Sequence, residues 1–144
     1  MKKMVEQLQR LEADTYILML KTHNFHWNVE GPYFQQLHLL FEGQYTELFA
    51  AVDEVAERLR AVNEKALGRY KDFQDRSKIK DSAETEYKKM IKELVESNES
   101  VVKTAQDLVK LAQKAGDEAT ADLAIKRIQA HQKNVWMLKS HLKK

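Results

Sequence analysis

The sequence predicts an all-α fold, a bundle of four long helices joined by two short turns and one long crossover. Glycine and proline are scarce, with 4 and 1 residues respectively, which favours long helices over sheets. Charged residues make up 32% of the chain and hydrophobic residues 43%, the balance expected of amphipathic helices. Apolar positions also recur at three- and four-residue steps. The 144 residues form one domain, 1–144, long enough to bury a core.

The first predicted helix spans residues 3–29, and the second spans 34–62. Glu30-Gly31-Pro32 separates them, because Gly suits a helix C-terminus and Pro disfavours α geometry in the residue before it. The short connection makes the two helices antiparallel neighbours. Their apolar faces contain Val5, Leu8, Leu11, Leu18, Met19 and Phe25, then Leu37, Phe41, Tyr45, Leu48, Val52, Val55, Leu59 and Val62.

Residues 63–80 interrupt the helical pattern. They contain Gly68, mixed charge and one apolar pair, Tyr70 and Phe73, enough for one or two helical turns. So long a connection is unusual in a compact domain. Extended, it could cover roughly 60 Å, the length of a bundle. We therefore expect a crossover that carries a short extra helix, not a domain boundary.

The third helix is expected to begin at Asp81-Ser82-Ala83-Glu84, which resembles a capping box. Its apolar stripe runs from Tyr87 to Ala112, and Gly116 ends it. Asp117 is then the N-cap of a fourth helix. Two short links and one long crossover are the connectivity of a ferritin-like bundle. The fourth helix is expected to bury Leu123, Ala124, Ile128, Val135, Trp136 and Leu138.

Composition also excludes several classes of protein. The chain has no Cys, which removes disulfides and thiolate metal sites. No apolar segment of signal-peptide length follows Met1-Lys2-Lys3, and no run approaches 18 apolar residues. We expect a soluble cytoplasmic protein with no membrane contact. The net charge of +2 gives no strong field to attract nucleic acid.

Four side chains form the candidate metal-binding set: His26, His38, Asp53 and Glu57. Two imidazoles and two carboxylates suit iron, zinc or manganese. Ferritins usually hold two irons inside one bundle through Glu-x-x-His pairs. No such pair occurs in this chain, in either direction, so a centre of that kind is not expected.

The four candidates cannot meet within one chain. His38 precedes Asp53 by fifteen positions, which is about 22 Å along a helix, whereas metal–ligand bonds are about 2 Å long. The two residues are nevertheless only about 60° apart around that helix. Two copies packed antiparallel about a two-fold axis would set His38 of one copy beside Asp53 and Glu57 of the other, twice. His26, close to the turn, could add the second imidazole.

These residues also carry a family resemblance. His23-Asn24-Phe25-His26-Trp27-Asn28-Val29-Glu30-Gly31, Phe34, His38 and Asp53-Glu54-Val55-Ala56-Glu57-Arg58 resemble the signature of the Dps family, the small dodecameric ferritins of bacteria and archaea. The similarity continues through Leu67-Gly68, Gly116-Asp117-Glu118-Ala119-Thr120-Ala121-Asp122 and Trp136-Met137-Leu138, so it covers essentially the whole chain.

The resemblance implies a ferroxidase, an oxidoreductase that protects against oxidative stress. Dps proteins oxidise Fe(II), preferring hydrogen peroxide to dioxygen, and store Fe(III) oxide inside a hollow shell of twelve subunits. It implies that His26 and His38 of one subunit face Asp53 and Glu57 of its mate as catalytic and metal-binding residues. Zinc or manganese could occupy the same ligands. The end of the chain just after the fourth helix favours twelve subunits over 24.

The resemblance also implies roles for three further acidic residues. Glu42, one turn after His38, is expected to hold a second iron or to seed mineral. Asp117 and Asp122 are expected to line acidic pores on three-fold axes that admit iron.

Simpler interpretations stand beside these. Asp53 and Glu57 could be a solvated helix face, with Glu57 paired to Arg58 or Arg60. Either His26 or His38 alone would more often be a hydrogen-bonded structural histidine, and the bundle could be a scaffold without chemistry. His23 is expected to lie outside the ligand set. Trp27 is expected to pack beside the metal, with a possible part in intercepting radicals. Trp136 is expected in the core or an interface, and His131 and His141 on the surface.

The alternative function is a structural shell that condenses DNA, with iron chemistry secondary. In this family DNA binding usually depends on flexible lysine-rich tails that neutralise phosphates. The chain offers few such residues, although many copies on a shell would add their contacts by multivalency. They are Lys2 and Lys3 at one end and Lys139, Lys143 and Lys144 at the other.

Overall fold

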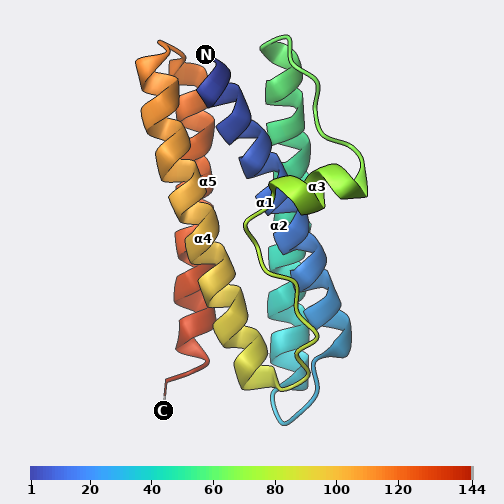
Figure 1. Ribbon diagram of the computed structural model, residues 1–144. Helices are drawn as coiled ribbons and strands as arrows, with labels where there is room; N and C mark the ends of the chain where they lie inside the picture. The colour runs from blue at the N-terminus through green and yellow to red at the C-terminus, as the bar shows by residue number, and fades with distance from the viewer. Residues whose placement is uncertain (144) are drawn as a thin grey trace.

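The computed structural model describes residues 1–143 and contains no strand in that range. Four long helices form the bundle, and a short fifth lies outside it (Figure 1). The all-α fold and the crossover with its short extra helix are therefore confirmed. The helices are α1 (Lys2–Asn28), α2 (Phe34–Ala61), α3 (Tyr70–Arg76), α4 (Tyr87–Lys114) and α5 (Glu118–Ser140).

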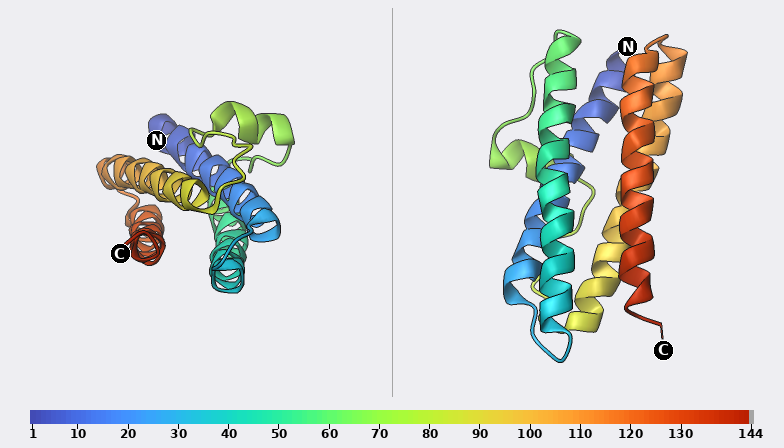
Figure 2. Two further views of the ribbon diagram at one scale, coloured as in Figure 1. Left: turned by 90° about the horizontal axis from the view of Figure 1, so that it is seen from below. Right: turned by 180° about the vertical axis from the view of Figure 1, so that it is seen from behind.

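Two helical hairpins make the bundle, α1 with α2 and α4 with α5 (Figure 2). They meet mainly where α1 packs on α4, while α2 and α5 touch only sparsely. Residues spaced three and four apart along each helix fill the shared core, as the periodicity predicts. The largest fully buried side chains are Phe25, Phe41, Met4, Leu8, Leu11, Leu18, Leu37, Leu48, Leu59, Met90, Ile91 and Leu94.

Both short turns form where the sequence places them. Gly31, at φ 122°, lies between the end of α1 and the start of α2 and adopts a backbone conformation that L side chains rarely take. Gly116, at φ 76°, ends the α4–α5 hairpin in the left-handed region. The Asp117 side chain then accepts a hydrogen bond from the backbone N–H of Thr120, which confirms Asp117 as the N-cap of α5.

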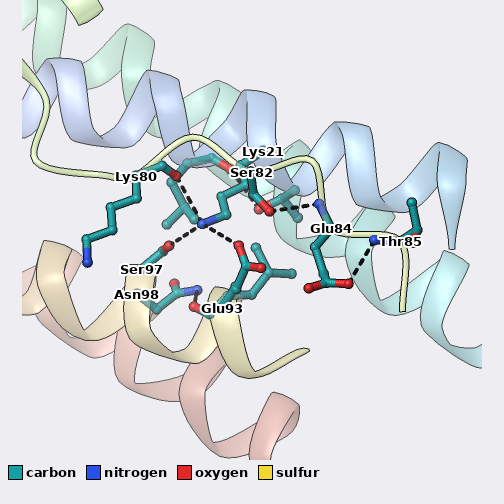
Figure 3. Close-up of polar contacts among 11 residues, drawn as sticks. Lys21, Lys80, Ser82, Glu84, Thr85, Glu93, Ser97 and Asn98 are labelled. Atoms are coloured by element: carbon teal, nitrogen blue, oxygen red, sulfur yellow. Dashed lines mark hydrogen bonds and ion pairs between the residues drawn. The ribbon is translucent and has the colours of Figure 1, made fainter. Parts of the chain in front are cut away.

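The predicted capping box at residues 81–84 is wrong, because α4 begins only at Tyr87. Its N-cap is Glu86, whose carboxylate accepts hydrogen bonds from the backbone N–H groups of Lys88 and Lys89. Upstream, Ser82 accepts from the N–H of Glu84, and the Glu84 carboxylate accepts from the N–H of Thr85 (Figure 3). The Glu84 carboxylate also accepts from the N–H of Glu86. These local bonds satisfy the backbone in an extended conformation, so residues 81–86 do not need a helix.

Polar side chains of α1 hold the crossover against the bundle. Buried Glu12 accepts from the N–H of Leu67, and buried Asp14 accepts from Lys78 N–H and from Ser77 Oγ. Burial raises the pKa of Glu12 to about 7. Tyr16 stacks on Phe73 of α3 with ring centroids 4.2 Å apart. These long-range contacts decide the path of residues that have little helical periodicity.

A buried lysine makes the last of these attachments. Lys21 donates to the carbonyl of Lys80 and to Ser97 Oγ, both at 3.1 Å, and pairs with Glu93 at 3.3 Å (Figure 3). The ammonium group thereby joins α1, the crossover and α4 with its charge compensated.

Two predictions for α5 are wrong. Trp136 is 66% exposed in the single chain, so its predicted burial in the core is wrong, and Leu138 takes the inward position in that turn of the helix; a place for Trp136 in an interface stays a prediction. His131 is fully buried instead of lying on the surface. His141 is exposed, as predicted. No helix within residues 1–143 has the length and apolar character needed to cross a membrane.

Candidate metal centre

His26 and His38 come together where α1 ends and α2 begins. The turn between the helices folds the two residues onto one another, and their rings stack with centroids 3.9 Å apart and planes 14° from parallel. Their hydrogen bonds are reciprocal: Nδ1 of each ring lies 2.7 Å from the backbone carbonyl oxygen of the other residue. Each histidine therefore orients the other.

These hydrogen bonds determine the tautomer of both rings. A carbonyl oxygen can only accept, so each Nδ1 must carry the proton and donate it. In the neutral imidazole, Nε2 then keeps its lone pair. An imidazole oriented through Nδ1–H to a carbonyl, with Nε2 free, is the arrangement that metal-binding histidines use.

Glu42 completes a three-residue cluster. It lies one helical turn after His38 on α2, and its carboxylate is 3.8 Å from His26 Nε2. The ligand atoms of His26, His38 and Glu42 all fall within 4.8 Å of one another. His26 is only 5% exposed, whereas the Glu42 side chain is 50% exposed, so the cluster is open on one side. Three protein ligands leave coordination positions for further groups.

Asp53 and Glu57 lie farther along α2, outside this cluster, and both are exposed. Asp53 borders a cavity of about 460 Å³ between α1, α2 and the crossover, lined also by Tyr16 and Phe49. The predicted charge pairs of Glu57 do not form among residues 1–143. Arg58 pairs with Asp117 at 3.2 Å, and Arg60 donates to the carbonyl of Glu64.

Several large apolar side chains of α1 and α2 are exposed. Leu20, Trp27 and Phe49 are 51%, 60% and 66% exposed. His23 stacks between Trp27 and Tyr45, with centroid distances of 3.7 and 4.1 Å, and lies outside the ligand cluster. Burial lowers the pKa of His23, and the neighbouring His26 imidazole lowers it further. Large exposed apolar side chains of this kind are typical of interaction surfaces.

The two acidic residues predicted to line a pore are both engaged within the chain. Burial would raise the pKa of Asp117, but hydrogen bonds from Thr120 and the charge of Arg58 outweigh it and hold that pKa below its usual value. Asp122 is exposed and pairs with Lys126 at 3.3 Å, one turn along α5. Their pore role stays a prediction.

A second histidine cluster, which sequence reasoning missed, lies inside the bundle. Nδ1 of His131 is 2.9 Å from Asn98 Oδ1, and Nε2 is 3.1 Å from Arg127 Nη2. Arg127 also forms a two-point ion pair with Glu47 of α2. Burial and the Arg127 charge lower the pKa of His131 well below its usual value. The available signal was spacing: both residues fall on the buried stripe that runs along α5 from Ala124 to Leu138.

The family model for a ferritin-like domain matches residues 5–144. The "DNA protection during starvation protein 2" of Bacillus anthracis is 34% identical over 98% of this chain and 97% of its own length. The structure of Dps from Thermosynechococcus elongatus matches at a TM-score of 0.96 with 33% identity, covering 99% of this chain and 92% of that one. Dps from Vibrio cholerae, described as a member of the ferritin-like diiron-carboxylate superfamily, matches at 0.93 with 29% identity, covering 99% and 90%.

Proposed function

We propose that this chain, which belongs to the Dps family of ferritin-like proteins, oxidises Fe(II) with hydrogen peroxide at sites shared by two subunits. The Fe(III) product is stored as mineral in a hollow shell of twelve subunits. The activity removes both ferrous iron and peroxide, and so protects the cytoplasm from oxidative damage.

The observation that carries the proposal is the pair of free Nε2 atoms on His26 and His38, held beside Glu42. Imidazole nitrogen suits Fe(II), and carboxylate oxygen suits the harder Fe(III) product. Histidines serving only the fold would have no need of two aligned, unprotonated nitrogens beside a carboxylate.

The remaining ligands would come from a second copy. Asp53 is about 22 Å and Glu57 about 28 Å from His38 along α2, beyond the reach of one ion. The exposed Leu20, Trp27 and Phe49 support a partner packed over this face, since an isolated chain would leave them in water. A two-fold axis there would create two equivalent sites, each with His26, His38 and Glu42 from one copy and Asp53 and Glu57 from the other.

The reaction balances with two ferrous ions for each peroxide. Each Fe(II) gives one electron, the O–O bond breaks, and both electrons go to one peroxide molecule. With two water molecules the products are two FeO(OH) and four protons, so no hydroxyl radical leaves the site. The histidines hold the substrate ion through Nε2, and the carboxylates stabilise the higher charge that develops. Zn(II) or Mn(II) at the same ligands would act as a competitor of iron.

Mixing two inactive variants tests the shared site directly. His38→Ala and Asp53→Ala should each abolish most peroxide-dependent Fe(II) oxidation, followed by absorbance, while the assembly survives. Co-refolded in equal amounts, they should recover about a quarter of the wild-type sites, because half of the two-fold pairs are mixed and each mixed pair keeps one intact site. Glu54→Ala, an exposed neighbour of Asp53, is the matched control and should oxidise iron normally.

Two outcomes contradict the proposal. Wild-type rates in either single variant would remove that residue from the site. No recovery in the mixed assembly, with mass spectrometry showing mixed pairs, would reject a site built from His38 of one copy and Asp53 of the other.

The structure gives the alternative, DNA condensation by lysine-rich tails, less support. Lys2 and Lys3 lie within α1, so they belong to a folded helix and not to a flexible arm. Lys139 also lies in a helix, α5, 4.0 Å from Glu99. Iron oxidation therefore remains the primary proposal.

A further inference from the structure

A cavity of about 510 Å³ lies between α2 and α5, which run side by side in opposite directions along one face of the bundle (Figure 2). The two helices touch only sparsely, so their backbones leave space between them. Residues from Leu39 to Glu47 and from Ala130 to Met137 contribute the lining. Gly43 is part of the wall, and a Cβ there would have no heavy atom within 4 Å, so the cavity is open above this residue.

The wall of this cavity contains a hydrogen-bond donor without an acceptor. Gln44 lines the cavity and is only 5% exposed, and its Nε2 has no hydrogen-bond partner within residues 1–143. Buried amide nitrogens are nearly always paired, because an unpaired donor has lost water without gaining an acceptor. A ligand that brings an oxygen atom to Gln44 would supply the missing acceptor.

The charges at the cavity favour an anion. Two charged residues line it, Glu47 and Lys133. The Glu47 carboxylate is already paired with buried Arg127, so its charge is compensated within the protein. Lys133 is exposed and forms no ion pair with residues 1–143. Its ammonium group is therefore available to attract a carboxylate.

The pairing of Glu47 with Arg127 also fixes how α2 and α5 lie against each other. Gln44 is three positions from this pair and Lys133 is six, which is about 4.5 Å and about 9 Å along the groove. Both lie in the same direction because the helices are antiparallel. Met137, ten positions away, lies farther on at about 15 Å, beside the two leucines of α2 that line the cavity. Polar groups thus occupy one end of the cavity, and apolar side chains occupy the other.

From this arrangement we propose that the cavity binds a straight-chain amphipathic carboxylate of the fatty-acid class. The carboxylate accepts a hydrogen bond from Gln44 Nε2 and pairs with Lys133. The hydrocarbon tail runs along Leu39, Leu40 and Met137. Small-molecule sites of this size are typically apolar, with a few polar groups that fix the orientation of the ligand. None of these residues belongs to the histidine cluster, so the site does not depend on iron oxidation.

Calorimetry at low salt, on the assembled full-length protein, tests the proposal with three probes: decanoate, decanol and butyrate. Decanoate should bind. Decanol should bind more weakly, because it brings no charge to Lys133. Butyrate carries the charge without a long tail and should not bind measurably, since burial of the tail supplies much of the binding free energy.

Variants then remove each part of the site in turn. Gln44→Leu keeps the size of the side chain but removes the donor, and should weaken decanoate binding about tenfold, as expected for one charge-assisted hydrogen bond. Gly43→Leu places a side chain in the open space and should abolish binding, while leucine favours the helix more than glycine does. Lys133→Gln should weaken decanoate severalfold. Its matched control is Lys126→Gln, an exposed lysine of α5 outside the cavity, which should have no effect.

The proposal is overturned if decanoate does not bind, or if its affinity is unchanged in Gly43→Leu and Gln44→Leu. It is also overturned if decanol binds as tightly as decanoate, since the cavity would then be an apolar groove without a carboxylate site. Circular dichroism checks the fold of every variant. Lys133→Gln changes only an exposed side chain, so it keeps the test decisive if a groove variant fails to fold.

Discussion

Two histidine clusters in this molecule contain similar side chains, but only one of them leaves imidazole nitrogens available to a metal ion. One joins His26 and His38 to Glu42 at the edge of the bundle, and the other joins buried His131 and Arg127 to Glu47, whose side chain reaches the surface. Each contains imidazole and a carboxylate from α2. They differ in what each second ring nitrogen meets.

At the edge cluster, backbone carbonyls engage only Nδ1, so both Nε2 atoms keep their lone pairs. In the interior cluster, Asn98 and Arg127 engage both nitrogens of His131, and the Arg127 cation takes the position that a metal ion would need. The comparison teaches that residue type alone does not make a ligand. An imidazole is available to a metal when its neighbours satisfy one nitrogen and leave the other.

The largest effect should come from breaking the interior cluster. Arg127 is 5% exposed, and Arg127→Met would leave His131 Nε2 without its partner and the Glu47 carboxylate uncompensated. Because the Glu47 side chain is 47% exposed and water can solvate it, we expect a loss of about 2 kcal/mol in unfolding free energy, less than for a fully buried pair. Urea unfolding measures it.

The control for this change is Lys126→Met, the neighbouring position. Lys126 is paired with Asp122 on the exposed face of α5, and surface pairs of this kind contribute about 0–1 kcal/mol. Equal losses in the two variants would show that the interior cluster adds nothing beyond an ordinary surface pair.

The next largest effect tests whether Glu42 belongs to the edge cluster. Glu42→Gln keeps the shape of the side chain but removes its charge, so we expect Zn(II), a redox-inert probe of the same ligands, to bind about tenfold more weakly, or about 1.4 kcal/mol. Equilibrium dialysis measures the affinity. Glu47→Gln is the comparison, because Glu47 faces Arg127 and should leave zinc binding unchanged. Unaltered affinity in Glu42→Gln would remove this residue from the cluster.

The smallest effect concerns pH. The pKa of His131 is lowered in the folded protein, so below about pH 6.5 the unfolded chain takes up a proton that the folded chain refuses. This contribution therefore destabilises the fold as pH falls, by about 1 kcal/mol between pH 7 and 5.5. His131→Gln, which can still donate to Asn98, should lose less stability over that range.

The pH dependence of the unfolding free energy must be compared between wild type and His131→Gln, not taken from the wild type alone. Glu12, whose pKa is raised to about 7, acts in the opposite direction, since its folded-state proton is lost as pH rises through that value. Its contribution cancels in the difference. Parallel pH profiles for the two proteins would mean that His131 does not control this slope.

Local patterns were enough for the helices and for most of their ends. Apolar spacing located α1 and α2 to within a residue, and Gly116 with Asp117 marked the α4–α5 turn. Such signals act between residues a few positions apart, where backbone geometry decides the outcome. The start of α4 was misplaced because contacts from α1, including Lys21 to the carbonyl of Lys80, keep the crossover extended.

The sequence by itself determined that His38 and Asp53 are too far apart on one helix to share an ion, because helical rise depends on nothing but residue count. It also singled out His26 and His38, and the family resemblance added Glu42. Only the tertiary structure decided that His26 and His38 hold each other through their backbone carbonyls. It also decided that both ring nitrogens of buried His131 are engaged, by Arg127 and Asn98. Those outcomes depend on which helices pack together, and packing joins atoms that the linear order of residues does not place side by side.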